Sequence, residues 1–107
     1  MSMRLVFCNC PDLASAEHIA EALVRARLAA CVNVIPGIRS FYRWQGQLER
    51  AEETLLLIKT VFDRVEALSE QIVALHPYEL PEVIAVEVDS GLPAYLRWVA
   101  EQSCEED

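Results

Sequence analysis

Positive charge is scarce in this sequence. Only nine of the 107 residues are basic; eight of these are arginine, and Lys59 is the single lysine. Seventeen acidic residues bring the net charge to -8. Phosphate recognition needs a positive patch that releases counterions, so this balance argues against a nucleic-acid partner. An acidic surface is compatible with attracting cations, although by itself it mainly favours solubility.

Long apolar runs and targeting signals are also lacking. No stretch approaches the ~18 uninterrupted apolar residues needed to cross a bilayer. The start, Met-Ser-Met-Arg, leads into a short strand-like run that does not resemble a signal peptide. The cysteines show no pairing pattern, so we expect free thiols at Cys8, Cys10, Cys31 and Cys104. Together these features predict a cytoplasmic protein with no membrane partner.

Catalytic signatures are missing as well. No nucleophile–base pair, phosphate-binding loop or pair of acid–base carboxylates can be placed in the sequence, so we predict that the protein is not an enzyme. There is no linker, repeat or low-complexity tract either. The length suits one ordinary domain, and we expect a single domain over residues 1–107.

Apolar residues, by contrast, are abundant. They make up 53% of the chain, against 24% charged residues, which predicts a folded globular protein. A domain of this size has a limited interior. The surplus apolar surface therefore suggests burial against another subunit.

The hydrophobic patterns predict alternating strands and helices. We expect strands over residues 4–10, 38–44, 48–60 and 83–88, with a mostly apolar run over 29–35 that ends at the breaker pair Pro36-Gly37. We also expect a helix capped by Asp12, a second helix capped by Asp63, and a last helix beginning at Pro93. The order β-α-β-β-α-β plus a C-terminal helix predicts an α+β, ferredoxin-like fold with an antiparallel sheet. Two helices then cover one sheet face and leave the other bare and apolar.

The two middle strands predict an unusually long hairpin. Arms over residues 30–44 and 48–60 would each span about 45 Å at ~3.3 Å per residue. A domain of this length has a radius of gyration of about 13 Å. The hairpin would overhang its own domain and present unpaired edges to another chain, so we expect an oligomer built through hairpins. Pro36 and Gly37 are expected to bend the first arm.

The register of this hairpin stays open in the sequence. A three-residue loop places Arg43 opposite Glu49 and Arg39 opposite Glu53, giving two favourable charge pairs. A two-residue loop places Arg39 opposite Glu52 instead.

Five tracts of the sequence resemble the CutA divalent-cation tolerance family. They are A-A-C-V-N-V-I-P-G (29–37), F-Y-R-W-Q-G (41–46), L-I-K-T (57–60), H-P-Y-E-L-P-E-V (76–83) and Y-L-R-W (95–98). The resemblance runs from about Leu5 to Val99 with the tracts in family order. It implies a ferredoxin-like homotrimer, related in architecture to the PII signalling proteins, that contributes to tolerance of copper and other divalent cations. It implies no catalysis.

The resemblance also implies a copper or other divalent-cation site. Cys8, His76 and Glu82 fall at the family's proposed ligand positions. Leu75 replaces a second histidine found in some members, and Cys10 supplies a further thiol.

Residue chemistry alone leaves this metal site open. Cys8 and Cys10 are two apart on a strand, so both thiols point to one face. A thiolate pair suits Cu(I), and an added imidazole suits Cu(II) or Zn(II). Alternatively, both cysteines are small hydrophobic residues beneath the helices, and His76 caps a helix C-terminus. We expect Cys31 in the core and Cys104 as an exposed thiol.

A second set of residues predicts a ligand cleft. It comprises Lys59, Tyr78, Glu82, Trp44 and Trp98. One interpretation is a salt bridge between subunits, with Glu82 or Asp89 as the partner of Lys59 and aromatic packing around it. The other is an intersubunit cleft for a small anionic or metal-chelate ligand, as in PII-like trimers. Three functions therefore remain: a metal-tolerance protein, a PII-like sensor, and a trimeric scaffold that binds a partner protein.

Overall fold

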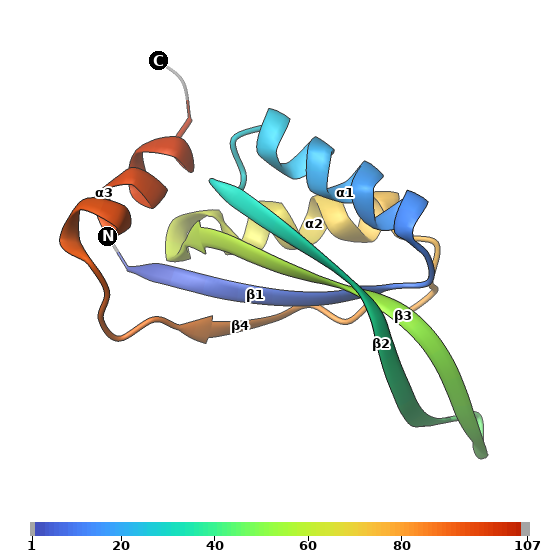
Figure 1. The fold of residues 1–107 in the computed structure, drawn as a ribbon. Helices are drawn as coiled ribbons and strands as arrows, with labels where there is room; N and C mark the ends of the chain where they lie inside the picture. The colour runs from blue at the N-terminus through green and yellow to red at the C-terminus, as the bar shows by residue number, and fades with distance from the viewer. Residues whose placement is uncertain (1, 106–107) are drawn as a thin grey trace.

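The strands and helices form two layers (Figure 1). The computed structural model describes residues 2–105. Its elements are β1 (Met3–Cys10), α1 (Leu13–Arg25), β2 (Cys31–Trp44), β3 (Gln47–Val61), the 3₁₀ turn η1 (Phe62–Arg64), α2 (Val65–Leu75), β4 (Ile84–Glu87) and α3 (Pro93–Gln102). The sheet order is β2-β3-β1-β4, and every neighbouring pair is antiparallel. The predicted α+β, ferredoxin-like topology is confirmed.

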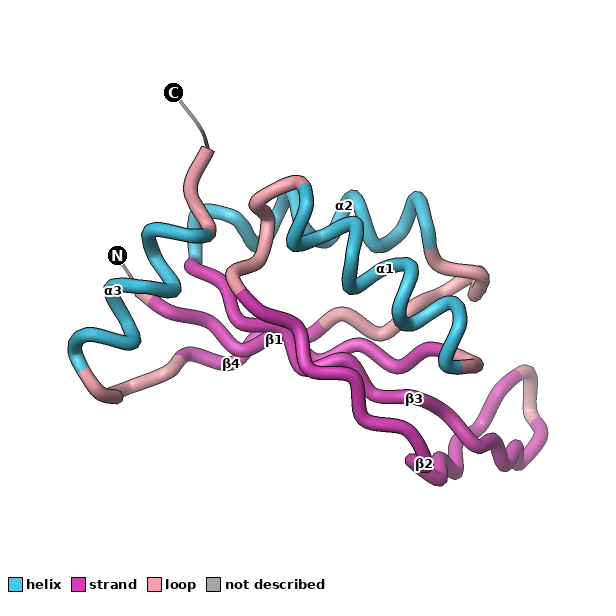
Figure 2. Tube along the Cα trace, turned by 45° about the horizontal axis from the view of Figure 1, so that its top comes forward, coloured by secondary structure: helices cyan, strands magenta, loops and turns pink. Residues whose placement is uncertain are grey.

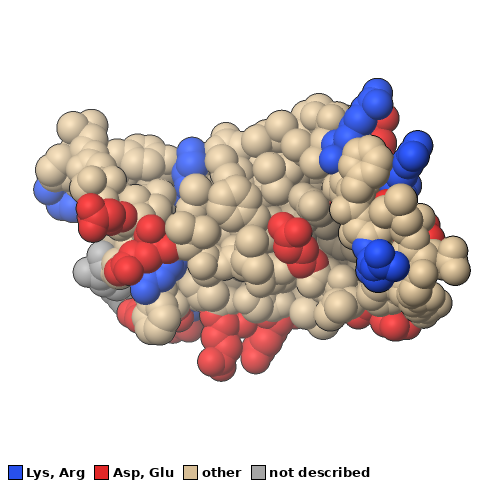
Figure 3. All heavy atoms as spheres, turned by 90° about the horizontal axis from the view of Figure 1, so that it is seen from below, with Lys and Arg blue, Asp and Glu red and all other residues tan. Residues whose placement is uncertain are grey.

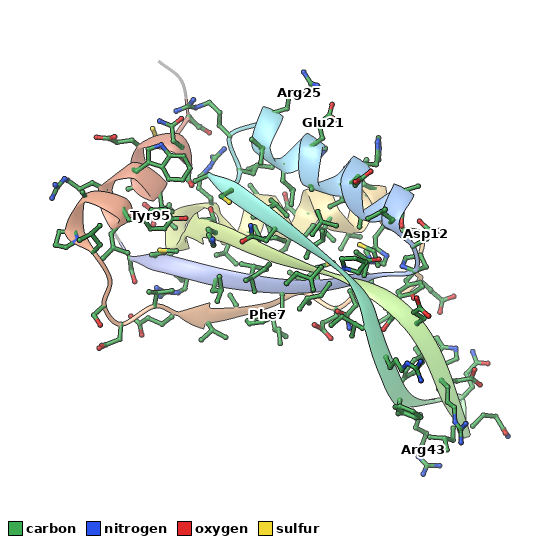
Figure 4. The ribbon with its side chains drawn as sticks, in the orientation of Figure 1. Phe7, Asp12, Glu21, Arg25, Arg43 and Tyr95 are labelled. Atoms are coloured by element: carbon green, nitrogen blue, oxygen red, sulfur yellow. The ribbon has the colours of Figure 1, made fainter. Side chains whose placement is uncertain are left out.

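Helix α1 begins as the sequence indicates. The Asp12 side chain accepts a hydrogen bond from the Ser15 backbone N–H at 2.8 Å, which satisfies one of the free donors of the first turn. Glu21 and Arg25 form an ion pair on the exposed side of the helix (Figure 4).

The predicted cap of the second helix is wrong. Asp63 lies inside η1, and Arg64 occupies the N-cap position of α2 without a side-chain hydrogen bond. The chain enters α2 through a 3₁₀ turn, so the helix begins two residues after Asp63. The apolar face is as predicted, because Leu68 and Ile72 are fully buried.

The main core lies between the sheet and the helices α1 and α2, which cover the same sheet face (Figure 2). Alternate strand residues point into it. They meet the apolar stripe of α1, and the fully buried members include Val6, Cys8, Cys10, Ile19, Leu23, Leu56 and Ile58. A smaller cluster of Met3, Ala30, Val61 and Val99 packs beneath α3.

The β2–β3 hairpin extends beyond the rest of the molecule (Figure 1). With the hairpin included, the longest extent of the molecule is 45 Å. Its turn has two residues, Gln45 and Gly46, both with positive φ, and Trp44 pairs with Gln47. The two-residue alternative is therefore the one that forms, and Arg39 lies opposite Glu52. The register shifts between Ile35 and Ile38, so the bend expected at Pro36-Gly37 is confirmed.

The sheet face opposite the helices is largely uncovered and apolar. Phe7 points away from the helices (Figure 4) and is flanked by Leu57 on β3 and Ile84 on β4. Charged side chains lie mainly towards the edges of this face in Figure 3. Cys31 was expected in the core, but it is only half-buried. Cys31 pairs with Lys59, which pairs with Leu5, so the three side chains share one sheet face. Val6, the neighbour of Leu5, points into the core, so Leu5 and Cys31 point to the open face.

Candidate functional site

Cys8, Cys10 and His76 meet beneath the helices. Both cysteines lie on the helix-facing side of β1, and His76 follows the last residue of α2. One potential ligand atom from each residue lies within 4.8 Å of the other two. All three side chains are buried, and the cysteines have no exposed surface. The sequence separates His76 from Cys8 by 68 positions, so only the fold brings them together.

The His76 ring is held by two hydrogen bonds. Its Nδ1 accepts the backbone N–H of Tyr78 at 3.0 Å. Its Nε2 lies 2.7 Å from the carbonyl oxygen of Asn9 and therefore carries the proton and donates. The backbone N–H of His76 also donates to Ile72 O at 2.8 Å and ends α2. The imidazole thus joins the loop after α2 to strand β1.

The two buried thiols have unlike acidities. A hydrogen bond from Cys8 stabilises a Cys10 thiolate and lowers the pKa of Cys10. The same bond, together with burial and the charge of Cys10, raises the pKa of Cys8 above the ordinary range. Cys10 is therefore the thiol that ionises first, and the remaining proton stays on Cys8 in the hydrogen bond between the two sulfurs.

The donor set fits a soft or borderline cation. Two sulfurs and one imidazole nitrogen are ligands that Cu(I) and Zn(II) accept. Two sulfur ligands of a tetrahedral zinc ion lie about 3.8 Å apart at ~2.3 Å per bond. Ligand atoms within 4.8 Å of one another therefore need to move by only about 1 Å to bind the same ion. Binding through His76 requires one of its two ring hydrogen bonds to open.

Glu82 lies outside this cluster. It lines an open cavity of about 770 Å³ between the hairpin, including residues close to its turn, and the loop at 77–82, here called the hairpin cavity. Its other lining residues are Asn9, Ser40, Phe41, Tyr42, Trp44, Gln45, Glu53, Pro77, Tyr78, Glu79 and Leu80. Three members of the predicted ligand-cleft set, Trp44, Tyr78 and Glu82, therefore line this cavity.

Lys59 and Trp98 lie elsewhere in the chain. The Lys59 ammonium is 5.9 Å from the ring centroid of Tyr95, which stacks on Trp98 with centroids 5.6 Å apart. Neither Lys59 nor Trp98 lines the hairpin cavity. Within one chain the predicted cleft residues therefore fall into two groups. One group lines the hairpin cavity, and the other, Lys59 on β3 and Trp98 on α3, lies around Tyr95.

Glu53 is a site residue that sequence reasoning missed. The residue is 95% buried, and its carboxylate accepts a 2.6 Å hydrogen bond from the Tyr78 hydroxyl. The Asn9 side-chain amide lies 3.5 Å from its other oxygen. In the sequence Glu53 looked like a surface partner for Arg39. The available signal was its spacing: residues 53, 55 and 57 share one strand face, and the last two are leucines.

The fold and the cluster together define a small ferredoxin-like protein with a thiol–imidazole cluster between its sheet and its helices. The sequence profile of the family described as CutA1 divalent ion tolerance protein matches residues 4–102, and the chain belongs to this family. No helix within residues 2–105 is both long and apolar enough to cross a membrane.

Individual relatives agree with this assignment. The Thermus thermophilus divalent-cation tolerance protein CutA is 44% identical over 99 residues, which cover 92% of this chain and 96% of the relative. A Xenopus laevis CutA homologue is 47% identical over 94% of this chain, which spans only 66% of that relative's length. The crystal structure of Xylella fastidiosa CutA, 51% identical, superposes with a TM-score of 0.94 and covers 97% of this chain and 100% of its own.

Relatives are named for different compartments. An Arabidopsis thaliana relative is named as chloroplastic, and an Archaeoglobus fulgidus structure is described as periplasmic. Family membership therefore leaves the compartment of this chain open.

Proposed function

We propose that this chain is a homotrimeric, non-enzymatic protein of divalent-cation tolerance that binds copper or a similar cation through Cys8, Cys10 and His76. The observation that carries the proposal is the convergence of these three ligand types within 4.8 Å. Glu82 has no place in this inner set; it lines the neighbouring cavity. The cytoplasm is the compartment proposed, since reducing conditions keep such thiols free.

Exposed apolar residues support a trimer. Ile84 is 55% exposed on the open sheet face, and Leu48, Leu80 and Leu92 are each at least 66% exposed elsewhere. Large apolar side chains in several exposed regions are expected where subunits pack together. The overhanging hairpin adds a long unpaired edge along β2.

Metal titration of the assembled protein tests the metal site. Cu(I) and Zn(II) are titrated separately under reducing conditions against a competing chelator. The background is Cys31→Ser/Cys104→Ser, which removes the two thiols outside the cluster. Cys8→Ser and Cys10→Ser are then added singly, and His76→Asn is compared with His18→Asn, a change at the exposed histidine of α1.

The expected result is one tight ion per chain in the background protein and at least a tenfold loss of affinity in each cluster variant. His18→Asn should bind like the background. Equal stoichiometry and affinity in all variants would remove these residues from the site. Sedimentation equilibrium of the same samples checks the trimer, and a monomer or dimer would contradict that part of the proposal.

A PII-like sensor is the second candidate, favoured by the size of the hairpin cavity. A cleft that includes Lys59 and Trp98 as well as Tyr78 and Trp44 requires two copies of the chain. A thermal-shift screen with small metabolites tests it. Stabilisation that disappears in Lys59→Ala would support a cleft of this composition, whereas stabilisation unaffected by that change would contradict it.

A further inference from the structure

We propose that the hairpin cavity binds an organic cation, such as a primary ammonium group carried on an aromatic or aliphatic body. This site is separate from the thiol–imidazole cluster and does not depend on it. The proposal rests on a buried carboxylate without a cationic partner, a second carboxylate beside it, and aromatic walls.

Glu53 provides the anchoring charge. Glu53 as a residue is 95% buried, and a buried carboxylate is costly unless a cation or several hydrogen bonds compensate it. Glu53 has the Tyr78 hydroxyl at 2.6 Å and the Asn9 amide at 3.5 Å. In the part of the chain that the structure describes, no lysine or arginine forms an ion pair with it. A cation entering the cavity would supply the missing charge.

Glu82 makes the same region more negative. Its carboxylate lines the cavity with Glu53, and partial burial together with the charge of Glu53 raises the pKa of Glu82. Like charges held near one another attract a cation and repel an anion. An anionic ligand, the class expected from the sequence for a cleft with Lys59, is therefore disfavoured in this cavity.

The aromatic walls select an organic cation over a bare metal ion. Phe41, Tyr42, Trp44 and Tyr78 line the cavity, and aromatic faces attract ammonium and guanidinium groups. The guanidinium of Arg50 already lies 5.6 Å from the centroid of Phe41. A hard metal ion prefers six or more oxygen ligands, which this lining does not resemble. The cavity volume of about 770 Å³ lies in the range of small-molecule sites.

Two matched pairs of variants test the proposal. Phenethylamine is titrated into the assembled wild-type protein at pH 7.5 with a chelator present, and binding is measured by calorimetry. Phenylacetate, of similar size and opposite charge, is titrated in parallel. Glu53→Gln is compared with Glu52→Gln, an exposed neighbour outside the cavity. Trp44→Leu is compared with Phe62→Leu, a change at an exposed aromatic residue that does not line the cavity.

The expected result is saturable binding of phenethylamine, no binding of phenylacetate, and at least tenfold weaker binding in Glu53→Gln. Trp44→Leu should weaken binding severalfold, with both control variants close to wild type. Equal affinities for the two probes, or equal effects within a matched pair, would overturn the proposal. So would the lack of any saturable heat up to about 10 mM amine, which would indicate that a second copy of the chain fills the cavity. Circular dichroism and sedimentation of Glu53→Gln are the controls that test whether this variant is folded and assembled.

Discussion

The hydroxyl of Tyr78 donates a 2.6 Å hydrogen bond to the carboxylate of Glu53. This contact ties the loop after α2 to strand β3, across 25 positions of the sequence. It also joins two of the residues that line the hairpin cavity. Partial burial and the charge of Glu53 raise the pKa of Tyr78 above its usual range, so the phenol stays protonated and remains a donor.

Removing this donor should destabilise the protein. Tyr78→Phe leaves a buried carboxylate with only the Asn9 amide, and we expect a loss of about 1–3 kcal/mol of unfolding free energy. The measurement is urea unfolding at one fixed protein concentration, because assembly contributes to apparent stability. Tyr42→Phe, at an exposed tyrosine of β2, is the control. Equal unfolding midpoints for the two variants would contradict the expected role of the bond.

The raised pKa of Tyr78 also predicts how stability depends on alkaline pH. The native state holds this proton more tightly than the unfolded chain, so its contribution is complete below about pH 10, the ordinary tyrosine pKa. As pH rises above that value, the unfolded state loses the proton first and stability falls. Wild type should therefore lose more stability than Tyr78→Phe between about pH 10 and 11, in paired denaturant titrations. Parallel curves for the two proteins would contradict this.

Metal affinity should rise with pH. The hydrogen bond to Cys10 and, after it, burial raise the pKa of Cys8, so a metal that binds both sulfurs must displace a proton from Cys8. One displaced proton corresponds to about tenfold tighter binding per pH unit. Competition titrations with Zn(II) from about pH 6.5 to 8 measure this slope. A flat profile would show that Cys8 keeps its proton and is not a ligand.

The buried hydroxyl of Thr60 offers a test of the core. Its Oγ1 donates to the Leu28 carbonyl at 2.7 Å and joins β3 to the segment after α1. Thr60→Val keeps the shape and removes the donor, so we expect a loss of about 1–2 kcal/mol in chemical unfolding. Thr60→Ser keeps the hydroxyl and removes only the methyl group, so the two variants distinguish the contribution of the hydrogen bond to stability from that of the methyl group. A Val variant more stable than the Ser variant would show that apolar packing dominates at this position.

The hairpin turn contains a position where stability can be gained. Gln45 has φ of 51°, a left-handed conformation that favours asparagine, and Gly46 follows with φ of 79°. Gln45→Asn creates the Asn-Gly pair typical of such two-residue turns, and we expect a gain of about 0.5 kcal/mol. Thermal unfolding of Gln45→Asn and Gln45→Val measures the effect. A Val variant as stable as wild type would contradict the conformational argument.

Local patterns were sufficient to predict most of the architecture. Asp12 caps α1 because a side-chain acceptor next to a helix start acts within a few residues. Asp63 has the same chemistry and the prediction failed there, since a 3₁₀ turn intervenes. The length of the hairpin turn decides whether Arg39 pairs with Glu52 or with Glu53. That length depends on the backbone conformations of Gln45 and Gly46, and the sequence was compatible with both lengths.

The sequence by itself determined the order of strands and helices, the face of each that is apolar, and the resemblance to the cation-tolerance family. These depend on periodicity and short tracts, which act locally along the chain. Only the tertiary structure decided that His76 meets Cys8 and Cys10, that Glu53 is buried and bonded to Tyr78, and that Lys59 lies beside Tyr95 and does not line the hairpin cavity. Such convergence depends on the packing of the loop after α2 against β1 and β3, which no local pattern encodes.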